Sequence, residues 1–395
     1  MIERSEKIKL FSQRLKDAKK ANRYFYLREI QGPSLARIIV EGKEFINFAS
    51  YSYLGLIEHP KIMKAAKDAI DKYGSGAGGV RLLAGTTTLH KKLEEKLAEF
   101  KKAEAAITFS SGYVTNLSTI SCLTDPKDII LIDKLDHASI IDGCMLSGAR
   151  FRTYKHNNME HLEKILEKSK DYNTKLIVAD AVFSMDGDIA DLPNIRKLAD
   201  KYGADLMIDE AHSLGVLGKT GKGIEQHFNM EGSVDISMGT LSKTIPSIGG
   251  YIASNKDIIN YLKHISRGFV FSASLPPSAV AATLAALEVM EEETWRYEKL
   301  RENIRLFNQG LTEMGFNTMN SETAVVPVLV GDEERTLELA RFLNDNGIYV
   351  CPILYPAIPK NTNRVRNHLM ATHSIEDINK ALDIYYKGGK KIGIK

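Results

Sequence analysis

Lys243 lies in a segment whose residue types suit covalent chemistry on a carbonyl compound. The segment reads Gly239-Thr-Leu-Ser-Lys-Thr-Ile-Pro-Ser-Ile-Gly-Gly250, so hydroxyl groups flank the lysine on both sides. A lysine that forms a Schiff base needs a nearby electrophile and a lowered pKa, and neighbouring hydroxyls can anchor a phosphate. A solvated loop lysine explains this segment alone equally well.

Asp209 and His212 follow the apolar run 206–208, which places Asp209 at the carboxyl end of an expected strand. A buried carboxylate there is costly unless it pairs with a cation, and a pyridinium nitrogen is such a partner. A helix-capping aspartate followed by a core histidine is the alternative, and it fits the segment better when the segment is taken alone.

Two further segments carry groups that suit a flat, phosphorylated ligand. Residues Ser110-Ser-Gly-Tyr-Val-Thr-Asn116 lead from a strand into a helix, where first-turn amides bind phosphate well. His137, in Asp136-His-Ala-Ser139, could lie over a heterocycle. Any strand-to-helix turn resembles the first segment, and a structural role for the histidine stays open.

These residues need elements that bring them together, and the chain alternates apolar runs with helix-like segments. The expected strands are 106–109, 129–132, 176–181 and 206–208, and the expected helices include 60–73, 89–102, 161–169 and 192–202. Such alternation predicts right-handed βαβ units and a mainly parallel sheet. Because the apolar runs do not alternate with polar residues, the strands should be buried on both faces, with ligands at their carboxyl ends.

After Pro276 and Pro277 a long helical stretch with a break near Glu293 leads to a smaller αβ portion. That portion contains the segments 325–330, 335–346 and 364–370. We therefore predict an N-terminal arm with short strands over residues 1–48, a large domain over 49–285 and a small domain over 286–395.

The composition favours a globular protein with a small partner. The 395 residues include 53 Lys+Arg and 50 Asp+Glu, a net charge of +3, which argues against nucleic acid as a partner. Three widely spaced cysteines fit neither a disulfide framework nor a metal site and favour the cytoplasm. Residues 1–20 form an amphipathic arm rather than an export signal, and the apolar stretch 279–290 is too short to span a membrane.

In their order and flanking context these segments resemble the α-oxoamine synthase family of fold type I pyridoxal-phosphate (PLP) enzymes, over essentially the whole chain. Further matching segments are Asn47–Leu56, Gly74–Thr86, Phe183–Asp188, Phe271–Pro277 and Arg364–His373. The resemblance implies an α/β fold in which a large PLP-binding domain with a mainly parallel central sheet, flanked by helices, is followed by a smaller C-terminal α/β domain. It also implies a homodimer whose active sites are shared between two chains.

The resemblance assigns roles to residues of this chain. Lys243 would bond covalently to PLP and move the α-proton of the substrate, and Asp209 would pair with the pyridinium nitrogen. His137 would stack on the ring, while His212 and Ser184 would lie near its phenolic oxygen. The remaining cofactor contacts would come from Ser111, Gly112, Tyr113, Thr240, Ser242 and, from a neighbouring subunit, Ser272 or Ser274.

For the substrate, the resemblance implies that Arg366 binds the carboxylate, because a guanidinium fork suits that bidentate task, with Tyr51 and Ser52 nearby. The implied reaction is a decarboxylative Claisen-type condensation of a small amino acid with an acyl thioester, acyl-CoA or acyl-carrier protein, giving an α-amino ketone, CO₂ and a free thiol. Residues Ser50-Tyr-Ser-Tyr53 look closer to serine palmitoyltransferase-like members than to glycine-using ones, and Ile245-Pro246 departs from the usual family pattern.

Two alternatives stay open at this point. Another fold type I activity, such as an aminotransferase, would transfer the amino group without releasing CO₂. A non-catalytic partner subunit would be expected to lack the lysine, whereas Lys243, Asp209, His137 and Arg366 are all present.

Overall fold

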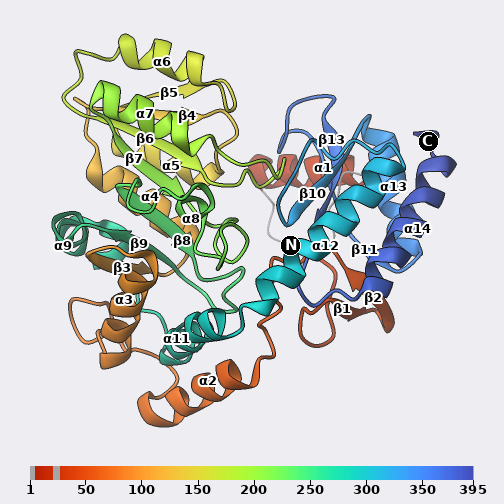
Figure 1. The fold of residues 1–395 in the computed structure, drawn as a ribbon, viewed down its shortest axis with the longest axis horizontal. Coiled ribbons are helices and arrows are strands. Elements are labelled where there is room, and N and C mark those ends of the chain that lie inside the picture. The colour runs from red at the N-terminus through yellow and green to blue at the C-terminus, as the bar shows by residue number, and fades with distance from the viewer. Residues whose placement is uncertain (1–4, 21–26, 395) are drawn as a thin grey trace.

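The computed structural model describes residues 5–20 and 27–394 of the chain, and residues 27–394 form two lobes (Figure 1). The helices are α1 Glu6–Lys20, α2 Pro60–Tyr73, α3 Thr88–Lys101, α4 Gly112–Leu123, α5 Ala138–Ser147, α6 Met159–Glu167, α7 Leu192–Tyr202, α8 Ile224–Phe228, α9 Lys256–Ile265, α10 Arg267–Val270, α11 Pro277–Glu292, α12 Trp295–Glu313, α13 Glu333–Asp345 and α14 Ile375–Lys391. The strands are β1 Arg37–Val40, β2 Lys43–Asn47, β3 Ala105–Phe109, β4 Ile129–Asp133, β5 Arg150–Tyr154, β6 Lys175–Asp180, β7 Asp205–Asp209, β8 Ile236–Thr240, β9 Gly250–Ser254, β10 Val325–Gly331, β11 Ile348–Tyr349, β12 Cys351–Ile353 and β13 Asn363–His368.

The large lobe is built on a seven-stranded sheet in the order β3-β9-β8-β7-β6-β4-β5. Strand β9 is antiparallel to both of its neighbours, whereas β8, β7, β6, β4 and β5 pair in parallel. The prediction of a mainly parallel sheet is therefore confirmed. The carboxyl ends of five strands meet at one end of this sheet, which is where ligands of such folds bind.

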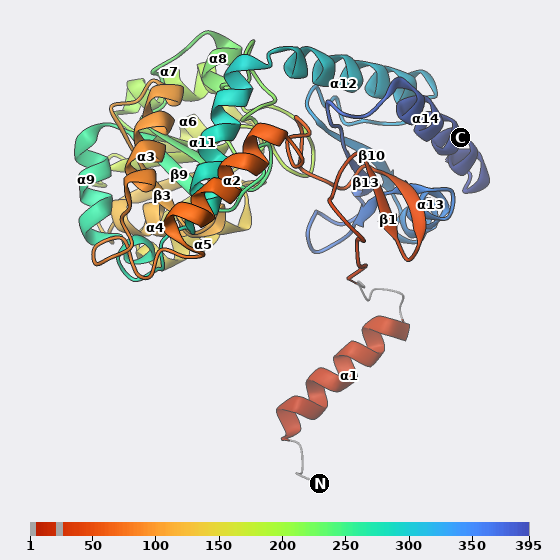
Figure 2. The same ribbon diagram turned by 90° about the horizontal axis from the view of Figure 1, so that it is seen from below.

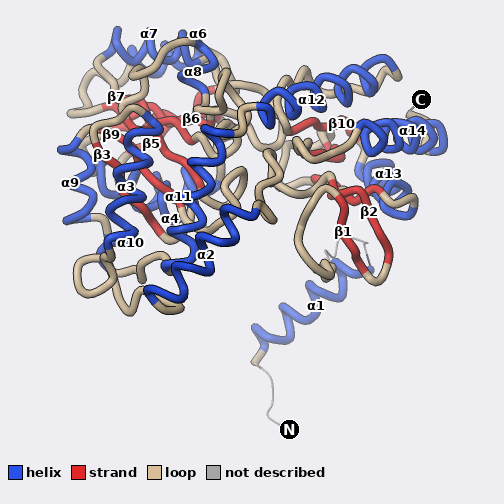
Figure 3. The backbone as a smooth tube through the Cα atoms, turned by 60° about the horizontal axis from the view of Figure 1, so that its bottom comes forward, coloured by secondary structure: helices blue, strands red, loops and turns tan. Residues whose placement is uncertain are grey.

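Both faces of this sheet are buried, as the unbroken apolar runs predict. In β4, Ile129 and Leu131 enter one core while Ile130 and Ile132 enter the other, because successive strand side chains point to opposite faces. Helices α2, α3, α6, α7 and α11 cover the first face, and α4, α5 and α9 cover the second (Figure 3). The helices predicted over 60–73 and 192–202 are α2 and α7.

The small lobe combines the two ends of the chain. Strands β10, β13 and β12 form an antiparallel sheet, with α12, α13 and α14 packed in the same lobe. Strand β2 pairs with β1 and, in parallel, with β11, so residues 37–47 join the C-terminal part in space. Residues 285 and 286 lie inside α11, which connects through α12 to the small lobe, and the domain limits stay a prediction.

Helix α1 has no buried residue and lies apart from both lobes (Figure 2). It matches the predicted helical arm over residues 6–20, while residues 1–4 lie outside the described residues. In the described parts of the chain no helix is both long and apolar enough to cross a membrane.

A buried ion pair fixes the chain where strand β7 ends. Lys101 Nζ lies 2.9 Å from Glu210 Oε1 and donates to the Lys222 carbonyl at 2.8 Å. The Lys101 and Glu210 side chains are 2% and 1% exposed, and Glu210 Oε2 accepts the Ile224 amide at 3.0 Å. Because Glu210 directly follows Asp209, this pair holds the segment that presents Asp209.

Replacing Lys101 by Met should lower the free energy of unfolding by about 3 to 5 kcal/mol, because it leaves the Glu210 carboxylate buried without its cation. Denaturant titration of the apoprotein, followed by circular dichroism, measures the change. Lys64→Met is the control, since it removes a pair with Asp68 whose side chains are 76% and 59% exposed. The control should cost less than about 1 kcal/mol, and equal losses in the two variants would contradict the prediction.

Candidate active site

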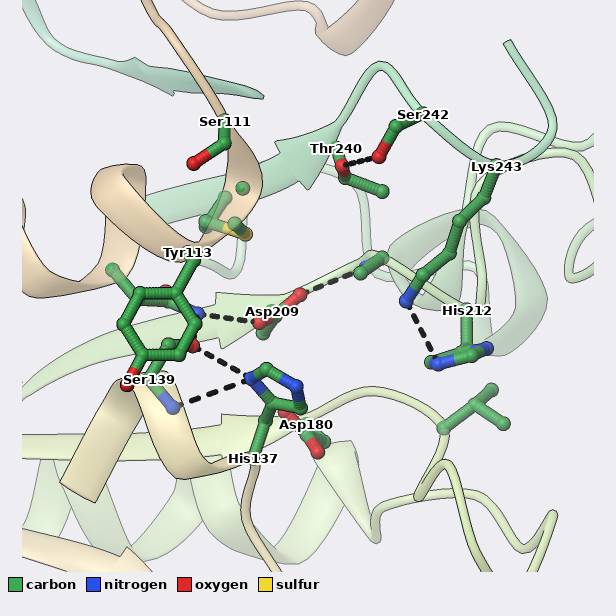
Figure 4. A pocket seen from close by; sticks show the side chains of 15 residues that line it. Ser111, Tyr113, His137, Ser139, Asp180, Asp209, His212, Thr240, Ser242 and Lys243 are labelled. Atoms are coloured by element: carbon green, nitrogen blue, oxygen red, sulfur yellow. Dashed lines mark hydrogen bonds between the residues drawn. The ribbon is translucent and has the colours of Figure 1, made fainter. Parts of the chain in front are cut away.

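A cavity of about 250 Å³ opens at the carboxyl ends of the parallel strands (Figure 4). Its lining comes from the turn between β3 and α4, the start of α5, the ends of β6, β7 and β8, and the loops that follow them. The residues predicted from sequence that line it are Ser111, Gly112, Tyr113, His137, Asp209, His212, Thr240, Ser242 and Lys243. Four segments far apart in sequence therefore converge on one site.

The Lys243 amine belongs to a hydrogen-bonded chain at one side of this cavity. Its Nζ lies 2.8 Å from Nε2 of His212, whose Nδ1 lies 2.6 Å from the hydroxyl of the fully buried Tyr53. Burial lowers the pKa of Lys243 to about 8, while the nearby carboxylates of Asp209 and Asp180 oppose that shift. Burial, followed by the charge of Lys243, also holds the pKa of His212 well below its usual value. Lys243 is thus an amine that loses its proton near neutral pH beside a neutral imidazole.

Asp209 lies at the end of β7 with its carboxylate facing the cavity (Figure 4). Its Oδ2 accepts from the Asn116 side-chain amide at 2.7 Å and its Oδ1 from the Ala211 backbone amide at 2.8 Å. The residue is only 4% exposed, so a carboxylate here favours a cationic partner. A protonated pyridine nitrogen meets that requirement.

A second carboxyl group, Asp180, occupies the matching position on β6, opposite Asp209 in the parallel register. Burial, together with the negative charge of Asp209, raises the pKa of Asp180 well above its usual value. Neither Asp180 nor Asn116 was predicted from the sequence as a site residue. The available signal was that Asp180 ends an apolar run just as Asp209 does, and that Asn116 closes the Ser110–Asn116 segment.

His137 is the N-cap of α5 and is exposed to the cavity. Its Nδ1 lies 2.7 Å from the Ser139 hydroxyl, which also accepts from the Asn116 amide at 2.9 Å. Partial desolvation lowers the pKa of this imidazole. The ring is therefore held by a network that also holds Asp209, and a flat heterocycle paired with Asp209 would lie within reach of it.

The opposite end of the cavity suits a phosphate group. Helix α4 begins at Gly112, and the Ser111 hydroxyl caps it by accepting the Val114 amide at 3.2 Å. The Thr240 and Ser242 hydroxyls lie 2.9 Å apart on the facing loop. A side chain at position 112 would come within 2.9 Å of Thr240 Oγ1, so glycine is needed there. Helix amides and two hydroxyls together fit a phosphate dianion.

Arg366 reaches the site from the small lobe, on β13. Its Nη1 donates to the Ser184 carbonyl at 2.8 Å and its Nη2 to the Tyr51 hydroxyl at 3.0 Å. The centre of the Tyr51 ring lies 5.4 Å from Lys243 Nζ and 5.8 Å from Arg366 Cζ, so Tyr51 contacts both residues. Arg366, Tyr51 and Ser184 do not line the 250 Å³ cavity, and Ser184 lines the adjoining one.

Three other predicted residues, Ser52, Ser272 and Ser274, do not line the 250 Å³ cavity. Ser52 is buried, and its hydroxyl has no partner among the described residues. Ser272 and Ser274 line a separate small cavity, where the Ser272 hydroxyl donates to Ser110 at 3.3 Å. They do not reach the cofactor cavity of their own chain, and their assignment to a neighbouring subunit stays a prediction.

Residues 43–384 match the aminotransferase class I and II family model. The chain is 47% identical to an 8-amino-7-oxononanoate synthase of Thermoanaerobacter pseudethanolicus over 97% of both proteins, and 45% identical to one of Treponema denticola over 98% of both. Among solved structures, serine palmitoyltransferase of S. paucimobilis with a bound PLP derivative superposes with a TM-score of 0.94 at 32% identity, covering 99% of this chain and 100% of that one. The Sphingomonas wittichii enzyme gives 0.93 at 34% identity, covering 98% and 97%.

The chain belongs to the α-oxoamine synthase family. It is a PLP-dependent acyltransferase of fold type I that condenses an amino acid with an acyl thioester and releases CO₂. The predictions of family, fold, cofactor and reaction class are confirmed. The roles of individual residues stay predictions, and the cavity chemistry fits them: a partnered carboxylate for the ring nitrogen, an amine of lowered pKa, and a helix N-terminus for the phosphate.

The lowered pKa of Lys243 predicts when the apoprotein takes up its cofactor covalently. Only the neutral amine attacks an aldehyde, so the rate of attachment should rise about tenfold per pH unit below pH 8 and level off above it. An ordinary lysine would reach its plateau more than two pH units higher, near its unperturbed pKa of about 10.4. Stopped-flow absorbance after mixing apoprotein with PLP measures this rate, and Lys243→Ala should give no covalent band. A plateau near pH 10 would contradict the prediction.

Proposed function

We propose that the protein makes 8-amino-7-oxononanoate from alanine and a seven-carbon acyl thioester that ends in a carboxylate. The observation that carries this proposal is the 47% identity, over 97% of both chains, to a relative named for that product. The solved serine palmitoyltransferases are similar in fold but less similar in sequence, at 32% to 34% identity.

The atoms of the product identify both substrates. The compound is a nine-carbon chain with an amino group on carbon 8, a ketone on carbon 7 and a carboxylate on carbon 1. In a decarboxylative condensation the amino acid supplies its Cα and side chain, which here are carbon 8 and a methyl group, so the amino acid is alanine. The remaining seven carbons come from an acyl group whose far end is a carboxylate.

Lys243 is the base in the proposed mechanism. When bound, PLP supplies an electron sink that stabilises negative charge at the Cα of the amino acid. The Lys243 amine takes the Cα proton, for which its pKa of about 8 is suited because an effective base is half-deprotonated near the working pH. Asp209 would hold the ring nitrogen in its protonated form by pairing with it, and His137 would pack against the ring.

The remaining steps are carbon chemistry that the protein positions. The Cα of alanine bonds to the thioester carbonyl carbon as the C–S bond breaks and the thiol leaves. Arg366 holds the alanine carboxylate until it departs as CO₂, and Lys243 then returns a proton to the same Cα. Arginine suits this task because its planar fork matches a carboxylate.

We place the acyl chain in a second cavity of about 670 Å³ that adjoins the first and shares His137 with it. Its lining is mainly apolar, with Leu135, Ile141, Phe183, Met185, Tyr355, Pro356, Ala357, Ile358 and Pro359, and it also includes the carboxyl residues Asp136 and Asp186. Lys134 lies on the same wall, and its ammonium has no ion pair or hydrogen bond with the described residues. Asp186 is paired with Arg364, and burial raises the pKa of Asp136 well above its usual value, so neither carboxyl group offsets Lys134. A mainly apolar channel with this lysine suits a hydrocarbon chain ending in a carboxylate.

We also propose that the enzyme works as a homodimer in the cytoplasm. A bridge between Val80 and Ala273 brings together two loops that carry exposed apolar side chains: Leu82 is 54% exposed, Leu83 84% and Phe271 74%. Exposed apolar groups of this kind mark association surfaces. The cytoplasmic location is supported by the free thiols of Cys122, Cys144 and Cys351.

An assay with purified holoenzyme tests the proposed reaction. Alanine, glycine and serine are each mixed with the seven-carbon ω-carboxyacyl-CoA, and free thiol, CO₂ and product mass are followed. Alanine should give the 8-amino-7-oxononanoate mass with a kcat/KM at least about tenfold above the other two, since one methyl group in a fitted pocket changes rates by that order. Preference for serine with a long-chain acyl thioester would overturn the proposal, and retention of carboxyl label in the product would favour an aminotransferase.

Lys134→Met tests the acyl site. We expect KM for the ω-carboxyacyl thioester to rise about fivefold, as for loss of a partly exposed ion pair, while KM for heptanoyl-CoA stays unchanged. Because both substrates carry the same CoA, a parallel rise would show that Lys134 contacts the nucleotide instead. Lys170→Met is the control, since Lys170 is exposed and lines neither cavity.

A further inference from the structure

We propose that Arg364, paired with Asp186, is a positioning residue that sets the place of Arg366 and thereby the affinity for the amino acid carboxylate. This inference rests on the proposed function, in which Arg366 binds that carboxylate. Arg364 touches neither of the two cavities, so it acts through Arg366 and through the loop 183–188.

Arg364 and Arg366 lie two residues apart on β13 and therefore point to the same side of the strand. Both reach the loop 183–188 of the large lobe. Arg364 Nη1 donates to the Met185 carbonyl at 3.1 Å and forms an ion pair with the Asp186 carboxylate, while Arg366 Nη1 donates to the Ser184 carbonyl. One short loop thus holds both guanidinium groups.

The Arg364 side chain is almost completely buried, at 2% exposed. Burial, with the positive charge of Arg366 beside it, lowers the pKa of Arg364 to about 10. Two neighbouring cations in a poorly solvated place repel each other, and the Asp186 carboxylate compensates that repulsion. Removing either partner of this pair should therefore displace Arg366 or the loop that it binds.

The loop itself is attached to both lobes. In the small lobe the Ser321 and Thr323 hydroxyls donate to the Gly187 carbonyl at 3.1 Å and 2.9 Å. In the large lobe His156 lies 3.0 Å from Asp133 and 2.9 Å from Asp188, and these two carboxylates raise its pKa to about 9 against the effect of burial. The loop thus connects the lobe that carries Lys243 with the lobe that carries Arg366.

The hydrogen bonds of Arg366 leave N–H groups of its guanidinium without a partner among the described residues. Nη1 is occupied by Ser184, and Nη2 uses one of its two protons for Tyr51. Nε is buried and has no partner among the described residues. Nε and the second proton of Nη2 form the parallel fork that binds a carboxylate with two hydrogen bonds. The direction of this fork depends on the hydrogen bond from Nη1 to the loop that Arg364 holds.

The experiment uses holoenzyme and compares two ligands, alanine and ethylamine, which is alanine without its carboxylate. Their Kd values are read from the change in visible absorbance of the bound cofactor. Arg364→Met and Asp186→Asn should each raise Kd for alanine about tenfold, the scale typical of residues that orient a binding group, and change Kd for ethylamine less than twofold. In a double-mutant cycle the combined variant should be no weaker than either single variant, because both remove the same contact.

Arg37→Met is the matched control. It removes ion pairs with Asp377 and Glu44 that involve neither β13 nor the loop 183–188, and Arg37 lines neither cavity, so both Kd values should stay unchanged. Equal weakening of alanine and ethylamine, or no weakening of either, would overturn the inference. If Arg364→Met does not fold, Asp186→Asn alone decides. Arg366→Met separates the two proposals. If it leaves the Kd for alanine unchanged, the proposal that Arg366 binds the carboxylate is wrong. If it raises that Kd while Arg364→Met does not, only the positioning role of Arg364 is wrong.

Discussion

The site depends on a carboxylate held at the buried end of a parallel strand. Asp209 is 4% exposed and receives two hydrogen bonds from neutral donors, and none of the described residues forms an ion pair with it. In the proposed mechanism a protonated pyridine would supply the cation, and the carboxylate would in turn keep the pyridine protonated. Most of the cavity is arranged around this requirement, from Asn116 that holds Asp209 to Ser139 that shares Asn116 with His137.

Burial shifts the pKa values of the basic and acidic groups around Asp209 in opposite directions. It lowers the pKa of Lys243 to about 8, which makes the amine available as nucleophile and base, and it keeps His212 neutral. It raises the pKa of Asp180, so that this second carboxyl does not compete with Asp209 for the cation. Burial thus favours the neutral forms of Asp180, His212 and Lys243 in the same cavity that holds the Asp209 carboxylate.

Arg366, which we propose binds the substrate carboxylate, lies on the small lobe. Its position relative to the cavity of the large lobe therefore depends on the contacts between the lobes. Arg366 is carried by β13, and its contacts with Ser184 and Tyr51 are all to segments outside the small-lobe sheet. The loop 183–188 is fixed by Arg364 on one side and by His156 on the other. Arg366 is therefore placed by interactions between segments more than 150 positions apart in sequence: Arg364 and Asp186, for example, are separated by 178 residues.

The sequence by itself predicted four strands of the large sheet, β3, β4, β6 and β7, and the helices α2 and α7 to the residue, because local periodicity specifies them. Through its ordered motifs it also singled out Lys243, Asp209, His137 and Arg366, whose roles stay predictions. It did not identify Asn116, Asp180, Tyr53 or the pair Arg364 and Asp186, whose roles come from partners that no local pattern specifies. Nor did it show that Ser272 and Ser274 lie outside the cofactor cavity of their own chain. Only the tertiary structure decided these points, because hydrogen bonds and desolvation depend on the distances between segments, and strand order and lobe contacts set those distances.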